Sequence, residues 1–154
     1  MTNTTKSHIE NDKPNVFSSE EHLIRFGYLD GFCERLLEVE LLVDLELNFE
    51  LSYSTFQLKR ITKLGRFDDN IGTELLALIE LDLSLLKKDY DIHDGATDFP
   101  FYTLVVNQYG DNWKFTLGAI PVKSEEHSVE EQLFFKTLLT LKNFLMKETG
   151  YEIN

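Results

Sequence analysis

With 154 residues, of which 42% are hydrophobic, the chain is large enough for one domain that buries its own core. Its formal net charge of −12 makes phosphate backbones and anionic lipid surfaces unfavourable partners, so we expect it to bind neither nucleic acid nor membranes. Its one cysteine, Cys33, excludes an intrachain disulfide. The sequence has no signal-peptide pattern and no apolar run near the roughly 20 residues of a transmembrane helix, so we expect a cytoplasmic protein.

The first predicted elements are an arm and a helix. Residues 1–17 are polar and lack periodicity, which is typical of a disordered or loosely attached arm. Ser18 and Glu21 have the spacing of a helix-capping box, and the apolar residues behind them recur at helical spacing: Leu23, Phe26, Leu29, Cys33, Leu36 and Leu37. We therefore expect a helix over residues 18–37, inside a single domain that spans 18–150 and is followed by a tail at 151–154.

Residues 39–53 alternate between apolar and polar side chains. Every odd position is apolar, and every even position except Leu42 is polar. Because successive side chains of a strand point to opposite faces, this alternation predicts one long strand whose odd residues point inward and whose other face is acidic. We predict that this acidic face contacts a partner, through Glu40, Asp44, Glu46 and Glu50.

A basic stretch follows at residues 59–66. Its bases stand between apolar residues and are Lys59, Arg60, Lys63 and Arg66. We expect a second strand whose bases pair with the acids of the first, since opposite charges on neighbouring strands stabilise a sheet. A phosphate-binding patch is the alternative, but no glycine-rich loop accompanies these bases.

Residues 73–86 are rich in leucine and fit either a helix or a strand. Leucine is the better helix former, and the acidic pair Asp68-Asp69 suits the N-terminus of a helix, so we predict a helix here. Residues 101–107 and 113–122 predict two strands joined by a turn at 109–112.

The last predicted element is a helix. Ser128 and Glu131 form a second capping box, and the helix behind them ends at Gly150. The predicted fold is therefore α+β, a mostly antiparallel sheet with helices packed on it, in the order α-β-β-α-β-β-α.

The sequence carries no familiar catalytic or cofactor motif. It lacks a phosphate-binding loop, a dinucleotide fingerprint and a nucleophile elbow, and its four histidines are scattered. The acidic stretch 89–98 suggests calcium, but an EF-hand loop beginning at Asp89 would need glycine where Asp94 stands and glutamate where Pro100 stands. We expect no metal, no cofactor, no catalytic residue and no enzymatic activity; a small-molecule-binding domain or an unfamiliar enzyme is a further alternative.

The order of elements between residues 65 and 150 points to a family. A leucine-rich segment at 74–86 is followed by strands at 101–107 and 114–121, which a turn at Gly110 and Asp111 joins, and by a helix at 129–147. This pattern resembles the type III secretion chaperones and the related YbjN-like fold. The resemblance implies a homodimer that holds an unfolded stretch of a secreted protein along hydrophobic grooves, without cofactor or turnover.

Two functions follow from these patterns. The first is a small acidic secretion chaperone, a non-enzymatic protein that binds and masks a partner polypeptide. The alternative is an immunity protein or another stoichiometric inhibitor, whose acidic surface covers a basic site on a toxin or nuclease and speeds association with it. Both functions require another protein as the partner, and the sequence does not name it.

Overall fold

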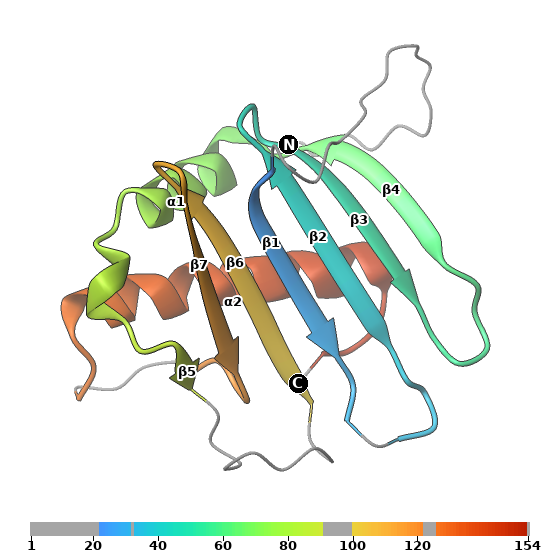
Figure 1. The fold of residues 1–154 in the computed structure, drawn as a ribbon. Helices are drawn as coiled ribbons and strands as arrows, with labels where there is room; N and C mark the ends of the chain where they lie inside the picture. Colours follow the sequence, from blue (N-terminus) through green and yellow to red (C-terminus); the bar gives the residue numbers. More distant parts are fainter. Residues whose placement is uncertain (1–21, 32, 91–99, 122–125, 154) are drawn as a thin grey trace.

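Four strands precede the first helix in the computed structural model, which describes residues 22–31, 33–90, 100–121 and 126–153. The strands are β1 His22–Leu29, β2 Glu38–Asp44, β3 Asn48–Ser54, β4 Ile61–Arg66, β5 Asp89–Tyr90, β6 Phe101–Gln108 and β7 Asp111–Leu117. They form one sheet in the order β4-β3-β2-β1-β6-β7-β5, in which only β5 and β7 pair in parallel (Figure 1). The helices are α1 Asp69–Ile79 and α2 Val129–Thr149, with a short 3-10 turn, η2 Leu83–Leu85.

The α+β class and the mostly antiparallel sheet are confirmed, but the predicted order α-β-β-α-β-β-α is wrong. Residues expected in a helix over 18–37 form β1, which lies in the middle of the sheet. Ile24, Phe26 and Tyr28 are buried at every second position, as in a strand. A register irregularity between His22 and Ile24 also buries Leu23, and this extra apolar residue gave the segment its helical spacing.

The expected capping box at Ser18 and the expected arm at 1–17 lie outside the described residues. Most of the acidic stretch also lies outside them, since residues 91–99 are not described. Its first residue, Asp89, begins the short strand β5 and accepts a hydrogen bond from the Thr116 hydroxyl on β7.

The stretch 39–53 is two strands, β2 and β3, rather than one. They are joined by a three-residue turn, in which Leu47 takes the left-handed conformation with a φ of 68°. Because the turn has three residues, paired positions such as Val43 and Phe49 are both odd-numbered. The apolar–polar alternation therefore continues through the turn, and nothing in the pattern marks the hairpin. Leu45 is the clear exception to the odd-inward prediction, since it lies in the turn and is 71% exposed.

The helix expected at 73–86 is α1, which begins and ends earlier. The Asp68 carboxylate caps it by accepting a hydrogen bond from the backbone amide of Ile71, so the helix starts in the acidic pair. It stops before Leu81, and Asp82 then caps the separate turn η2, which buries Leu83 against the core. The leucine-rich run is therefore a helix followed by a tight turn.

The hairpin β6–β7 and the helix α2 form where the sequence predicts them, but β7 begins at Asp111 rather than at residue 113 and ends at Leu117 rather than at 122. Tyr109 and Gly110 form a two-residue turn with φ values of 50° and 89°, the conformation that antiparallel hairpins favour. The capping box at Ser128 and Glu131 is confirmed by two reciprocal hydrogen bonds of 3.0 Å. Gly150 ends α2 with a φ of 79°, which a glycine adopts without a steric penalty.

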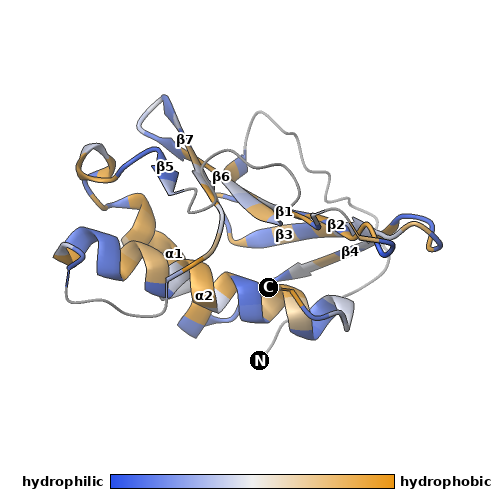
Figure 2. Cartoon of the chain, turned by 90° about the horizontal axis from the view of Figure 1, so that it is seen from below, coloured by the Kyte–Doolittle hydropathy of each residue, from blue (hydrophilic) through white to orange (hydrophobic). Residues whose placement is uncertain are grey.

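Both helices cover the same face of the sheet (Figure 2). The core lies between these two layers and includes an aromatic cluster of Phe49, Phe67 and Phe144, with ring centroids 4.8–5.0 Å apart. No described helix covers the opposite side of the sheet, which we call the open face. No helix among the described elements combines the length and apolarity needed to cross a membrane.

Candidate functional site

The open face is a grid of side chains whose columns are the strands. Strand pairing places one row across the sheet: Thr116, Thr103, Gly27, Glu40, Ser52 and Thr62. The neighbouring row is Lys114, Val105, Arg25, Leu42, Glu50 and Leu64. Figure 1 looks onto this face, with α2 passing behind the strands. Hydroxyls, charges and aliphatic side chains are therefore mixed on this face of the sheet.

The structure separates the four acids that the sequence placed on one strand face. Glu40 and Glu50 lie on the open face, on β2 and β3 respectively. Asp44 lies at the β2–β3 turn, where its carboxylate accepts hydrogen bonds from the backbone amides of Glu46 and Asn48, each 2.9 Å long. Glu46 is exposed in the turn itself. Asp44 therefore shapes the turn, and two of the four acids belong to the open face.

Lys63 and Arg66 of β4 do not pair with these acids as expected, whereas Arg60, just before β4, donates to the Ser52 hydroxyl and attracts Glu50 without a hydrogen bond to it. Lys63 pairs in register with Leu51 and points inward, where its ammonium donates to the backbone carbonyl of Glu148 at the end of α2. Arg66 donates to the backbone carbonyl of Glu46 in the turn. A one-residue change of register reverses the face of every side chain, so the sequence could not decide which bases would meet the acids.

The base that pairs with an acid of the open face is Arg25 on β1, whereas the sequence had predicted this pairing for the bases at 59–66. Its Nε donates to Oε2 of Glu40 on the neighbouring strand, within the open face. Sequence reasoning missed this pair because it placed residue 25 in a helix. The alternation of Arg25 with buried Ile24 and Phe26 was the available signal.

Glu50 lies half-buried on the open face between Leu42 and Leu64. Among the residues that the structure describes, its carboxylate has no hydrogen-bond or ion-pair partner. Burial raises its pKa, repulsion by Glu40 raises the pKa further, and the attraction of Arg60 opposes both effects. An ionised group that is partly removed from water without a partner raises the free energy of the folded chain.

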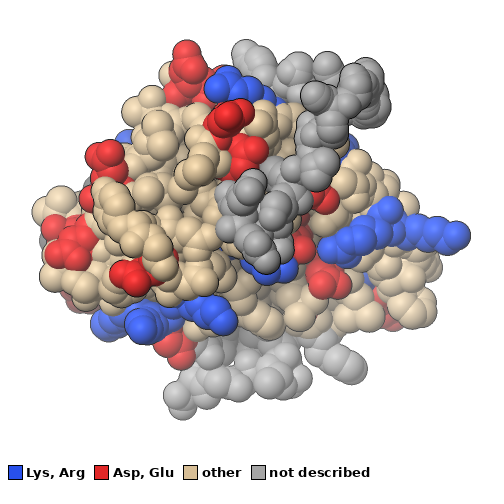
Figure 3. All heavy atoms as spheres, turned by 45° about the horizontal axis from the view of Figure 1, so that its top comes forward, with Lys and Arg blue, Asp and Glu red and all other residues tan. Residues whose placement is uncertain are grey.

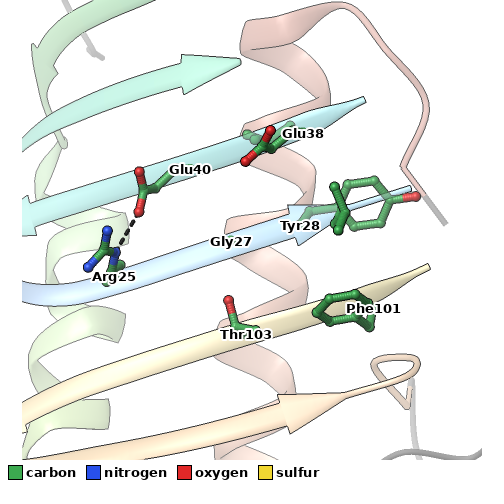
Figure 4. Close-up of a pocket in the computed structure, with 9 residues that line it drawn as sticks. Arg25, Gly27, Tyr28, Glu38, Glu40, Phe101 and Thr103 are labelled. Atoms are coloured by element: carbon green, nitrogen blue, oxygen red, sulfur yellow. Dashed lines mark hydrogen bonds and ion pairs between the residues drawn. The ribbon is translucent and has the colours of Figure 1, made fainter. Parts of the chain in front are cut away.

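A hollow of about 340 Å³ lies over Gly27, and we call it the trough (Figure 4). Its walls come from the outward side chains of three strands: Arg25, Leu29, Glu38, Glu40, Phe101 and Thr103. The trough exists because Gly27 contributes no side chain to the middle of this group. It lies beside the Arg25–Glu40 ion pair, which Figure 4 shows at its border.

Asp30 is a carboxylate that sequence reasoning did not single out. It is buried at the end of β1 and accepts hydrogen bonds from the Arg35 guanidinium at 2.7 and 2.8 Å, the Tyr28 hydroxyl at 2.9 Å, the Leu37 amide at 2.7 Å and the Cys33 thiol at 3.4 Å. Burial alone would raise the pKa of Asp30, but these bonds, led by those from Arg35, lower it to about 2. All five donors come from β1 and from the loop before β2, so Asp30 organises this loop rather than a reaction.

Charge alone does not outline a site on the face that Figure 3 shows. In the space-filling view of Figure 3, Asp and Glu side chains appear at several separate places, with Lys and Arg side chains between them. Within the described ranges, no group of three or more His, Cys, Asp or Glu side chains is placed to hold a metal ion. No family model matches the chain, and a search of curated proteins found no relative.

Proposed function

We propose that this protein binds another polypeptide stoichiometrically on its open face, without catalysing a reaction. The observation that carries the proposal is Glu50, a half-buried carboxylate whose pKa is raised by burial and by Glu40. A lysine or arginine from a partner would relieve this unfavourable state, because an opposite charge nearby stabilises the ionised form. The partner segment would therefore be basic.

Other parts of the open face support the same function. Leu29 and Phe101 are 38% and 40% exposed on this face and offer apolar contact area. Thr62 and Thr103, both exposed in the row that crosses the sheet, offer hydroxyls that can donate or accept hydrogen bonds. Protein interfaces combine apolar contact with polar groups in this way.

Of the two functions expected from the sequence, the open face favours the stoichiometric inhibitor. An inhibitor of a basic toxin or nuclease would use unpaired acids to attract and hold its target. The secretion-chaperone resemblance rested on the elements between residues 65 and 150, which this fold contains as α1, β6, β7 and α2, and on the overall order α-β-β-α-β-β-α, which it does not have. The chaperone therefore stays a second prediction, together with its implied homodimer, which analytical ultracentrifugation of the full chain would test.

The experiment compares two variants that lose the same charge at different places. Tagged wild type, Glu50→Gln and Glu46→Gln would be used to capture partners from the native source, and the captured protein would be purified for calorimetry. We expect Glu50→Gln to weaken association, with a smaller loss at high salt, while Glu46→Gln in the turn binds like wild type. Equal affinity of all three proteins would show that the open face is not the contact surface.

A chaperone groove would give a different result. Binding would then be insensitive to salt and would fall when an exposed apolar residue of the helices is changed. Leu76 of α1, which is 48% exposed, is the suitable position, as Leu76→Ser. Loss of binding by Leu76→Ser with normal binding by Glu50→Gln would replace the inhibitor with the chaperone.

A further inference from the structure

We propose that the trough over Gly27 binds an arginine side chain of the partner polypeptide, an inference that rests on the function proposed above. The shape of the trough is the first argument. Gly27 pairs in register with Glu40 on one side and Thr103 on the other, so one missing side chain opens the sheet surface between two filled columns. A Cβ atom built on Gly27 would lie 2.9 Å from the Thr103 hydroxyl oxygen, so any side chain at this position would crowd the trough.

The second argument is the apolar end of the trough. Leu29 and Phe101 are direct neighbours across β1 and β6, and both are partly exposed. A guanidinium stacks on an aromatic ring more favourably than an ammonium does, and the methylene stem of arginine packs on apolar surface. This wall therefore favours arginine over lysine.

The third argument is the charge of the walls. Glu38 and Glu40 stand two positions apart on β2, so their carboxylates project from the same face at a spacing of about 7 Å. Arg25 pairs with Glu40, whereas Glu38 has no hydrogen-bond or ion-pair partner among the described residues. One cation thus faces two carboxylates, and one further cation would neutralise the remaining negative charge of the trough. A guanidinium carries five N–H donors in a fixed plane and can bind both carboxylates at once.

The probe is Nα-acetyl-L-arginine amide, titrated into the ¹⁵N-labelled full chain and followed by NMR. Nα-acetyl-L-citrulline amide is the control, because it has nearly the same shape without the charge. We expect saturable shifts of the amide signals of Gly27, Leu29 and Thr103 with arginine, and a dissociation constant on the order of millimolar for so small a ligand. Equal shifts with citrulline, or arginine shifts only outside the trough, would overturn the inference.

Variants locate the interaction. Glu38→Gln should weaken arginine binding by about two- to fivefold, the usual range for an exposed ion pair, and Glu46→Gln should leave it unchanged. Arg25→Gln should strengthen binding, because it removes a competing cation. Gly27→Ala should weaken binding by filling the trough; if that variant does not fold, Glu38→Gln decides. Equal weakening by Glu38→Gln and Glu46→Gln would overturn the inference, since net charge would then be the cause.

The outcomes separate this inference from the proposed function. If the trough does not distinguish arginine from citrulline but Glu50→Gln still weakens partner binding, the inference is wrong and the function stands. If the trough binds arginine but partner binding is the same in wild type, Glu38→Gln and Glu50→Gln, the open face is not the partner surface and both proposals fall. Partner binding that weakens with Glu38→Gln and is displaced by arginine amide supports both.

Discussion

The carboxylates of Asp30 and Glu50 are both shielded from water by burial, but their hydrogen-bonding surroundings differ completely. Asp30 accepts hydrogen bonds from five donors, and its pKa falls to about 2. Glu50 has no such bond among the described residues, and its pKa is raised, first by burial. A carboxylate whose hydrogen bonds are satisfied holds a loop in place, whereas one left without a partner marks a surface that gains from binding a cation.

Asp30→Ala tests the structural side of this comparison and has the largest expected effect. It leaves the Arg35 guanidinium and the Leu37 amide without their acceptor. Breaking a buried ion pair lowers the free energy of unfolding by about 3–5 kcal/mol, and because the Arg35 side chain is 32% exposed and regains water, we expect a loss at the lower end of that range. Urea unfolding followed by circular dichroism measures the loss. Glu46→Ala, at an exposed turn position, is the control, with an expected change below about 0.5 kcal/mol. Similar losses in the two variants would contradict the role of Asp30.

The acid dependence of stability gives the next largest effect. Because the pKa of Asp30 is lowered from 3.8 to about 2 on folding, its contribution is present above the unfolded value and is lost as pH falls through the folded one. The contribution is about 2 kcal/mol. Melting temperatures of wild type and Asp30→Asn, measured from neutral pH down to about pH 2, should therefore converge in acid. Parallel curves would show that Asp30 keeps its ordinary pKa in the folded protein.

Glu50→Gln should have a small effect of the opposite sign. A carboxyl whose pKa is raised by folding opposes folding when it is ionised, so removing its charge raises the melting temperature at neutral pH. The gain should stay below about 0.5 kcal/mol and should vanish below pH 4.5, where the unfolded carboxyl is protonated too. Calorimetry at both pH values checks it. A lower melting temperature at neutral pH would mean that the Glu50 charge stabilises the fold.

Cys33→Ala refines the account of Asp30 and has the smallest expected effect. The thiol is a weak donor, and its contact with Asp30 is the longest of the five at 3.4 Å. We expect a change below about 0.5 kcal/mol in urea unfolding. A loss near that of Asp30→Ala would mean that the thiol, rather than Arg35, holds the carboxylate.

Local chemistry explains which parts of the fold could be predicted. The capping box at Ser128, the glycine after α2 and the Tyr109-Gly110 turn act within a few residues, so the sequence shows them directly. The β2–β3 turn is equally local in the sequence, but the residue pattern did not reveal it. Its left-handed residue is Leu47 rather than glycine, and its three-residue length keeps the alternation in phase across the hairpin.

The candidate site was harder to predict because it depends on strand register. Glu40 and Glu50 were identified from their own strand, but their neighbours come from elsewhere in the sheet. Arg25 and Gly27 meet Glu40 only because β1 pairs with β2. The importance of Asp30 depends on a loop that folds back onto it, and no spacing rule describes that loop.

The position of β1 has a consequence for how the chain folds. One edge of β1 pairs with β2, which follows after a short loop, but the other edge pairs with β6, which begins at Phe101. During synthesis, β1 to β4 can form a meander of neighbouring hairpins long before β6 leaves the ribosome. Until then the edge of β1 that will later pair with β6 stays unpaired, and unpaired strand edges tend to pair with other chains. Joining β1 to β6 closes a long loop, so we expect this step to limit the folding rate and aggregation to be most frequent before it.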